Sequence, residues 1–529
     1  MGTAGVLESR QERSTDARLP VPSKDVLLPL AAGVVAALMV LPLLSYYFVW
    51  DQCVFAVLAD SMRRGGVAYR DAWEHKPPGI SVVYWLAFSV FGHDYWSIRV
   101  LEILSIAASS AGLMHLARSR FGTIAGGWVA AIGFPAVYLV LGGNTAQPET
   151  FQIPFVVWGL AIWPEREDTE CLGVRCFMTG VLLSVVVLLK TPMVTFPALV
   201  LADRILADRH RAGWGGKTTL TAITAAGVAA PLFLITAYYL ARGAGTEFLD
   251  ALVIFPAKYA AYCSDRSALG ALRHFLGWPQ WFLPLAPGVL LALGIVRGAL
   301  VRPRATLRWG CTFAAAWVSI ALQGKYFDYH HLPIVPFLAL GFALPFAEPR
   351  DPLLAERTRR LWARAAWVLV ALGMVQYSPF LFAAWRGFPA LARLDVPTGE
   401  LPEAVGEGGE REVAQWIRSV CGPDERMFVW GNKPILYFLA DRPMAGPYCH
   451  MLGMIPPWPE PARLSRLIRR LDVEKPKVIV VCSSDQCWWQ SQDAKTLLTE
   501  SLEMKALVSD VYRLVRRVGR YELWVRREL

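Results

Sequence analysis

The chain has 529 residues, of which 55% are apolar and only 18% are charged, and its mean hydropathy is +0.37. A typical soluble domain is about 25% charged, so this composition excludes a soluble enzyme, a disordered chain and a small disulfide-rich protein. The formal net charge is +10. In a polytopic helical membrane protein, which the composition predicts, loop Lys and Arg set the topology and contact anionic membrane lipids, so we expect no nucleic-acid partner.

The N-terminal region predicts a cytoplasmic segment followed by a first membrane helix. Residues 1–25 are polar and are expected to be disordered. The segment Val26–Phe48 has no charge, and at about 1.5 Å per residue it spans a hydrocarbon core of about 30 Å. It is too long for a signal peptide and no cleavage site follows it, so we expect an uncleaved helix.

Hydropathy predicts about eleven membrane helices within a domain of residues 26–385. The sequence Lys190-Thr191-Pro192 divides one long apolar stretch and predicts a break where two helices meet at a membrane surface. After the first helix, the expected spans are roughly 98–117, 124–141, 149–163, 174–189, 191–203, 219–241, 280–296, 309–322, 331–347 and 365–385.

The distribution of Lys and Arg predicts the orientation. With a cytoplasmic N-terminus, the cytoplasmic segments hold about twice as many Lys and Arg as the outer loops, as the positive-inside rule requires. An odd number of helices then places the C-terminal tail outside the cytoplasm of a plasma (inner) membrane protein. Two outer loops, 49–97 and 242–279, are long. The apolar piece Ile80–Phe91 is too short to span and is expected to be an interfacial helix.

The C-terminal region predicts a small α/β domain. Residues 386–409 are rich in Pro, Gly and Glu and indicate a linker, and residues 410–529 alternate between helix-like and strand-like patterns. The expected helices are 410–420, 434–440, 460–472 and 493–503, and the expected strands are 426–430, 477–482, 510–516 and 520–526. In an extracytoplasmic tail, one or two disulfides are expected among Cys421, Cys449, Cys482 and Cys487.

The first outer loop begins with a carboxylate at the membrane boundary. Asp51 directly follows the first apolar stretch. A partly desolvated carboxylate suits general-base chemistry. From position alone, however, an interfacial Asp that merely ends a helix is the stronger interpretation, because charges at membrane boundaries are common.

The same loop contains the sequence Glu74-His75-Lys76-Pro77-Pro78. Two prolines fix the backbone just before the interfacial helix, so three ionisable groups lie at headgroup depth. Lys76 can bind a phosphate as a point charge, and Glu74 with His75 can offer oxygen and nitrogen ligands to a divalent ion. The alternative is a polar turn that anchors the loop.

These motifs resemble one family of membrane enzymes. Asp51, the stretch GGVAYRDAWEHKPPG at 65–79, Phe91-Gly92 and Arg99-Val100-Leu101 follow one another in the order seen in the superfamily of dolichyl-phosphate-mannose protein mannosyltransferases and aminoarabinose transferases, which are GT-C fold glycosyltransferases. Weaker matches are TAQPETF at 145–151, LLKTP at 188–192 and YFDYHHLPIVP at 326–336, and Val429-Trp430-Gly431 resembles the outer domain of bacterial members.

The resemblance implies an inverting glycosyltransferase that moves a sugar from a polyprenyl phosphate to a hydroxyl of an envelope lipid, glycan or protein. The catalytic carboxylate corresponds to Asp51. Many relatives have Asp-Glu here, whereas this chain has Asp51-Gln52, which leaves no second carboxylate at that point. Lys76 and Arg70 are expected to bind the donor phosphate, and Glu74 and His75 are the candidate metal ligands. The expected cavity residues are Glu74, His75, Glu149, Lys190, Tyr329 and His330.

A transporter or flippase for a lipid-linked saccharide is the alternative function. Transporters tend to have paired broken helices and polar groups near the membrane midplane. The polar motifs of this chain gather at one predicted face, which favours the enzyme.

Overall fold

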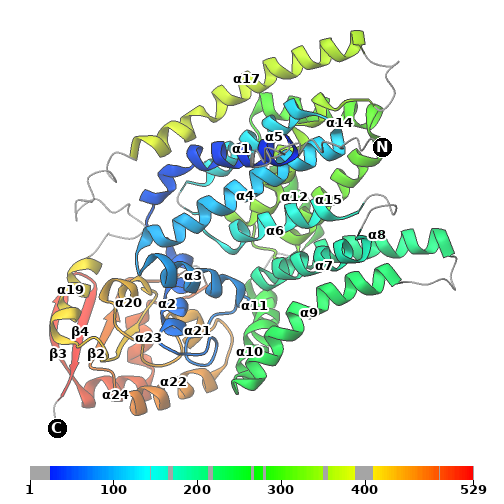
Figure 1. Ribbon diagram of the computed structural model, residues 1–529. Coiled ribbons are helices and arrows are strands. Elements are labelled where there is room, and N and C mark those ends of the chain that lie inside the picture. Colours follow the sequence, from blue (N-terminus) through cyan, green and yellow to red (C-terminus); the bar gives the residue numbers. More distant parts are fainter. Residues whose placement is uncertain are drawn as a thin grey trace, which may run out of the picture.

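The computed structural model describes residues 24–142, 144–164, 171–212, 219–263, 267–277, 282–349, 356–387, 409–487 and 489–527. The chain is mostly helical and ends in a small domain with a four-stranded sheet (Figure 1). The predicted fold class, a polytopic helical protein with a C-terminal α/β domain, is confirmed. The N-terminal segment 1–25 and the linker 386–409 lie almost wholly outside the described residues.

Most helices before the C-terminal domain overlap the predicted segments, but residues 50–63, 245–249, 255–263 and 268–277 form helices inside the two predicted outer loops. The helices in this part of the chain are α1 Lys24–Met39, α2 Trp50–Arg63, α3 Gly79–Phe91, α4 Tyr95–Phe121, α5 Ile124–Tyr138, α6 Pro148–Ile162, α7 Leu172–Leu189, α8 Thr195–Ala212, α9 Thr219–Ala241, α10 Gly245–Leu249, α11 Phe255–Cys263, α12 Ala268–Gly277, α14 Leu285–Val301, α15 Pro303–Ala321, α16 Val335–Gly341 and α17 Glu356–Gly387. The 3₁₀ helix η5, Asp328–Ile334, precedes α16.

Among the described residues, six helical segments are long and apolar enough to cross a membrane, which supports a multi-pass membrane protein. The predicted number of eleven membrane helices is therefore not confirmed, because only six described helices have the length and hydropathy of a membrane span. The expected single first helix is also wrong. Helix α1 ends at Met39, and a 3₁₀ turn follows at Leu41–Ser45. Pro42 lies in that turn, and its missing N–H and its ring prevent an α-helix from continuing.

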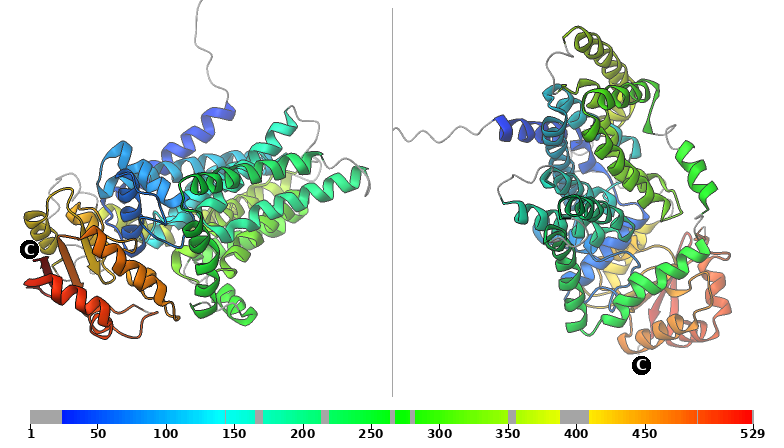
Figure 2. Two further views of the ribbon diagram at one scale, coloured as in Figure 1. Left: turned by 90° about the horizontal axis from the view of Figure 1, so that it is seen from below. Right: turned by 90° about the vertical axis from the view of Figure 1, so that its right-hand side faces the viewer.

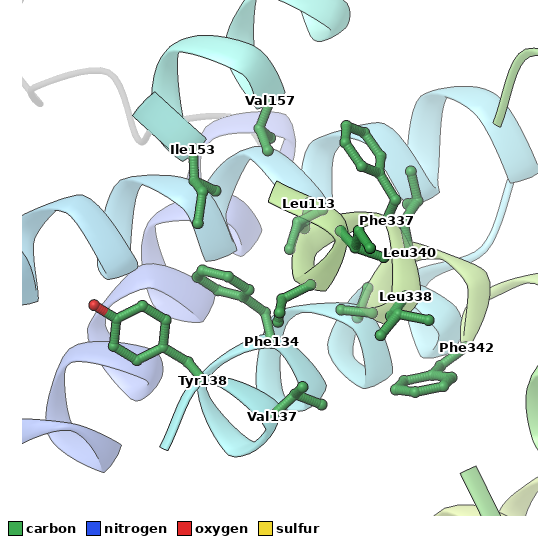
Figure 3. Close-up of a cluster of buried hydrophobic side chains, with 14 of the residues drawn as sticks. Leu113, Phe134, Val137, Tyr138, Ile153, Val157, Phe337, Leu338, Leu340 and Phe342 are labelled. Atoms are coloured by element: carbon green, nitrogen blue, oxygen red, sulfur yellow. The ribbon is translucent and has the colours of Figure 1, made fainter. Parts of the chain in front are cut away.

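A buried apolar core joins α4, α5, α6 and α16 (Figure 3). Helix α16 is apolar on every face, and all of its residues are buried. This is expected for a helix that other helices enclose. The core holds η5 against α6 and α15 and thereby positions the residues of η5. Its labelled side chains are Leu113, Phe134, Val137, Tyr138, Ile153, Val157, Phe337, Leu338, Leu340 and Phe342.

A fully buried ion pair ties three segments together. Arg99 Nη1 lies 2.7 Å from Glu102 Oε2 on α4, and both side chains are completely buried. Arg99 also donates to Gln52 Oε1 on α2, and Glu102 accepts from the Tyr138 hydroxyl and from the amide of Ala146. Charges in an apolar interior persist only when they are paired and hydrogen-bonded. The pair therefore fixes the start of α2, which carries Asp51, against the loop before α6, and Glu149 follows that loop in the first turn of α6.

We expect Glu102→Leu to destabilise the protein strongly, because it leaves the Arg99 charge buried without its carboxylate. Breaking a buried pair in this way typically costs about 3–5 kcal/mol. Thermal unfolding of the purified protein in detergent measures the effect. The double variant Arg99→Met, Glu102→Leu should recover part of the loss, because no buried charge remains. Wild-type stability of the single variant would contradict this role.

The C-terminal sheet has the strand order β1-β2-β4-β3. Strand β1 (Met427–Trp430) pairs in parallel with β2 (Val478–Cys482), and β4 (Tyr521–Arg526) pairs antiparallel with β2 and with β3 (Tyr512–Val518). Strands β1 and β2 are buried along their length, as expected for strands covered on both faces. The helices are α19 Glu410–Val420, α20 Ile435–Ala440, α21 Met451–Met454, α22 Pro461–Glu474, α23 Ala494–Glu500 and α24 Leu502–Val511.

The C-terminal domain lies beside α2 and α3, away from the far ends of α7 and α9 (Figures 1 and 2). Val54 and Val57 of α2 share one apolar core with Ile417 and Leu436 of the domain. The predicted disulfides are wrong, because Cys421, Cys449, Cys482 and Cys487 are all free thiols. Cys449 and Cys482 are instead fully buried as small apolar side chains.

Candidate active site

A cavity of about 1200 Å³ lies between the membrane helices and the C-terminal domain. Of the nine sequence-predicted site residues, six line it. They come from the start of α2, the first long loop, the end of α7 and η5. The six residues are Asp51, His75, Lys76, Lys190, Tyr329 and His330.

Asp51 does not end the first membrane helix, as the sequence suggested, but lies in the first turn of α2. The helix starts here because the Gln52 side chain accepts a hydrogen bond from the Val49 amide at 2.9 Å. The Tyr329 hydroxyl donates to Asp51 Oδ2 at 2.9 Å, and Lys76 Nζ lies 3.2 Å from the same oxygen. One carboxylate oxygen thus joins three distant segments.

Lys76 is a fixed cation in this cavity. The Tyr69 hydroxyl donates to the Lys76 carbonyl at 2.9 Å, and Lys76 Nζ lies 4.6 Å from the centre of the Phe55 ring. Burial alone would lower the pKa of Lys76, but the charges of Asp51 and Glu74 outweigh burial and raise it. Lys76 is thereby held as the cation of an ion pair with Asp51.

Glu74 lies behind the cavity rather than in its wall and is only 2% exposed. Its Oε1 is 2.7 Å from His75 Nδ1, and its Oε2 is 3.2 Å from Nε2 of His450 in the C-terminal domain. Burial would raise the pKa of Glu74, but His75, the hydrogen bond from His450 and the charge of Lys76 hold it well below its ordinary value. Glu74 is thus a buried carboxylate that links the loop to the domain.

Metal-ligand side chains gather elsewhere in the described part of the chain. Asp60, His93 and Asp441 have ligand atoms within 4.8 Å of one another. Arg64 already bridges the two carboxylates of this group, with one guanidinium nitrogen 2.8 Å from Asp60 and another 2.8 Å from Asp441. Arg63 also lies 3.3 Å from Asp60, so two arginines face the two carboxylates, and Arg64 links the end of α2 to the C-terminal domain.

Lys190 and Glu149 form an ion pair beside Asp51. Helix α7 ends at Leu189 and a 3₁₀ helix begins at Thr191, which confirms the predicted break. Glu149 lies in the first turn of α6 and is fully buried. Lys190 Nζ also lies 5.4 Å from the centre of the Tyr329 ring. Lys190 is thereby held beside the ring of Tyr329, whose hydroxyl binds Asp51.

Two remaining predicted residues have different surroundings. His330 lies in the cavity wall, with its ring 4.6 Å from that of Tyr329 in an edge-to-face contact. Arg70 pairs with Asp71 at 2.9 Å and donates to the Arg242 carbonyl, and it is not part of the cavity wall. The structure therefore does not bring Arg70 to the cavity.

Sequence reasoning missed the part of the cavity wall that comes from the C-terminal domain. Leu452, Cys487 and Trp489 of the domain line the cavity, and the ring of Trp489 lies 5.6 Å from that of Trp50. Lys325 lines it as well, with its Nζ over the Tyr259 ring. The domain residues carry no motif of their own, and only folding places them beside Asp51.

Comparisons with known proteins give a family match over part of the chain and a likeness in fold over most of it. Residues 75–254 match the family model described as dolichyl-phosphate-mannose-protein mannosyltransferase. ArnT from Cupriavidus metallidurans bound to undecaprenyl phosphate has a TM-score of 0.59 at 16% identity, covering 94% of this chain and 97% of that chain. Its apo form has a TM-score of 0.55 at 15% identity with the same coverage. No curated protein matches the chain significantly in sequence.

The family match includes the segments that carry Lys76, Glu149 and Lys190, and the likeness in fold to ArnT extends over nearly the whole chain. The family match begins at His75, so it includes the end of the first-loop motif but not Asp51. Over residues 75–254 the chain is therefore similar to the dolichyl-phosphate-mannose protein mannosyltransferases, and over nearly its whole length its fold is like that of ArnT, as the motifs of the first loop led us to expect.

Proposed function

We propose that the protein transfers a sugar from a polyprenyl-phosphate donor to a hydroxyl of an envelope lipid, glycan or protein, with inversion at the anomeric carbon. The observation that carries this proposal is Asp51 held by Lys76 and Tyr329 in the wall of a large cavity. The undecaprenyl phosphate bound to ArnT supports a donor of this chemical class.

Asp51 would act as the general base. It removes the proton from the acceptor hydroxyl while the hydroxyl oxygen attacks the anomeric carbon and the bond from that carbon to the phosphate oxygen breaks. Polyprenyl phosphate leaves with the bonding electrons. General-base catalysis contributes roughly 10²–10⁴-fold. Because Lys76 pairs with Asp51 in this structure, a donor phosphate that attracts Lys76 also frees the carboxylate for the proton.

The cations of the cavity would stabilise the leaving phosphate. Lys76 and Lys190 both line the cavity near Asp51, and preorganised charges in a water-poor site lower the barrier without a cost of reorganisation. The lipid part of the donor fits the apolar stretch of the wall, which includes Leu252, Pro256 and Leu322.

A divalent ion at Glu74 and His75 stays a prediction. The two residues supply one carboxylate and one imidazole in contact. Metal ions with such ligands usually need three or more protein ligands, and neither residue belongs to the close group of ligands in the described chain. The proposed reaction needs no step on a metal. Metal analysis of the purified protein and activity after chelation test the point.

We also propose that residues 26–385 form the catalytic membrane domain and that residues 410–529 lie outside the cytoplasm of a plasma (inner) membrane. A cysteine introduced near Glu407 should react in intact cells with a thiol reagent that cannot cross membranes, because the excess of cytoplasmic Lys and Arg sets this orientation. A cysteine introduced near Arg10 should react only after lysis. The reverse pattern would overturn the orientation.

The proposed activity is tested with purified protein in lipid nanodiscs and a polyprenyl-phosphate sugar. We expect release of polyprenyl phosphate together with a glycosylated acceptor. Mass spectrometry of envelope glycolipids and glycoproteins, with and without the gene, identifies the acceptor. Movement of the intact donor between leaflets without release of polyprenyl phosphate would favour a flippase instead.

A further inference from the structure

The C-terminal domain contacts the residue that precedes Asp51. The Trp50 indole N–H donates to the Asn432 carbonyl at 3.2 Å, and the Trp50 ring meets the rings of His450 and Trp489 at 5.2 and 5.6 Å. Trp50 therefore lies between the start of α2 and three residues of the domain. Because Asp51 is the next residue in the chain, these contacts of Trp50 also fix the backbone that carries Asp51.

The domain also holds the loop that carries Lys76. The Trp73 amide donates to the Pro447 carbonyl at 2.7 Å, and the Arg463 guanidinium lies 4.6 Å from the centre of the Trp73 ring. Gly453 approaches so closely that a Cβ there would lie 2.9 Å from the same ring. A side chain at Gly453 would push the loop away, so this glycine is required by the close approach.

His450 adds a polar contact to this loop. Its Nε2 lies 3.2 Å from Glu74 Oε2, and His450 and Glu74 are both almost fully buried. Asn432 fixes the backbone beside His450, because its Oδ1 accepts from the Met451 amide at 3.1 Å. The buried carboxylate of Glu74 stands two residues before Lys76, so the domain sets the backbone from which the lysine extends.

We infer that the C-terminal domain is part of the active site and that His450 is a positioning residue, which orients Lys76 through Glu74. The Asn432 carbonyl does the same for Asp51 through Trp50. The inference rests on the proposed function, since positioning has a chemical consequence only if Lys76 meets the donor phosphate. Misplacing a catalytic group by about 1 Å can cost about 10²-fold in rate. The contact between His450 and Glu74 can therefore affect the rate of transfer although neither residue touches the substrate.

The test compares two substitutions at His450. His450→Phe keeps a ring but loses the hydrogen bond to Glu74, and we expect kcat to fall more than tenfold while KM for the donor changes less than threefold. His450→Gln keeps an N–H donor and should restore at least part of kcat. Initial rates with a polyprenyl-phosphate sugar in nanodiscs measure both constants. Wild-type kcat in His450→Phe would overturn the inference.

Arg466→Gln is the matched control. Arg466 lies on α22 of the same domain and pairs with Glu247 of α10 at 2.9 Å, so this variant weakens domain contact away from Lys76. It should keep wild-type kcat. A loss in Arg466→Gln as large as that in His450→Phe would indicate general loosening of the domain and would overturn the specific role of His450.

Hydrogen exchange separates this inference from the proposed function, because it requires no donor. The amides of residues 65–79 should exchange faster in His450→Phe than in the wild type or Arg466→Gln, since the loop loses its buried contact. Unchanged exchange would overturn the positioning role. If the wild type releases no polyprenyl phosphate while loop exchange still responds, the proposed function fails and the contact between domain and loop stands.

Discussion

Asp51→Asn is expected to lower the rate of sugar transfer by roughly 10²–10⁴-fold, the usual contribution of a general base. Asn has the same shape and its amide oxygen can still accept from the Tyr329 hydroxyl, which donates to Asp51 at 2.9 Å. The variant should therefore insert and fold normally. The measurement is the initial rate of polyprenyl-phosphate release at equal protein concentration.

Asp60→Asn provides the control for this prediction. Asp60 lies further along the same helix, α2, and pairs with Arg63 and Arg64, so its removal changes the charge of the helix without reaching the cavity. We expect near wild-type transfer. Normal turnover in Asp51→Asn would remove Asp51 as the base, and equal losses in both variants would point to a general effect on α2.

Lys76→Ala is expected to reduce transfer more than tenfold. Removing a buried, hydrogen-bonded charge contact costs about 2–5 kcal/mol, and about 1.4 kcal/mol corresponds to one decade in rate. The Lys76 side chain is only 14% exposed and lies 3.2 Å from Asp51, so the free-energy range for buried charge contacts applies to it. Initial rates for the variants with a polyprenyl-phosphate sugar measure the effect.

Lys76→Arg distinguishes binding of phosphate from simple anchoring of the loop. Arg keeps the charge, but its planar fork differs from the compact ammonium, so we expect partial rescue. If Lys76 only anchored the loop to an anionic surface, the contact would contribute about 1 kcal/mol. Lys76→Ala would then lose only a few-fold and Lys76→Arg would be fully active, which would contradict the phosphate role.

Local sequence signals were sufficient for most secondary structure. In the C-terminal domain, strands β1 and β2 coincide with the predicted strands to within a residue, because short apolar runs between polar segments identify buried strands. The end of α7 at Leu189 followed from Pro192, since a proline acts on the backbone of its own turn. At Pro42 the same local signal was present but was not used, so residues 26–48 were predicted as one long helix where the structure has two elements.

The sequence by itself determined the class of protein, the motif of the first loop and most of the chemically reactive residues in the cavity. Only the tertiary structure decided how they meet. Tyr329 reaches Asp51 across 278 positions, and His450 reaches Glu74 across 376. Such contacts leave no periodic pattern in the chain, because their closeness follows from the packing of whole helices and of the C-terminal domain rather than from any local preference. For the same reason the structure separates Arg70 from the cavity, although it lies only six positions before Lys76.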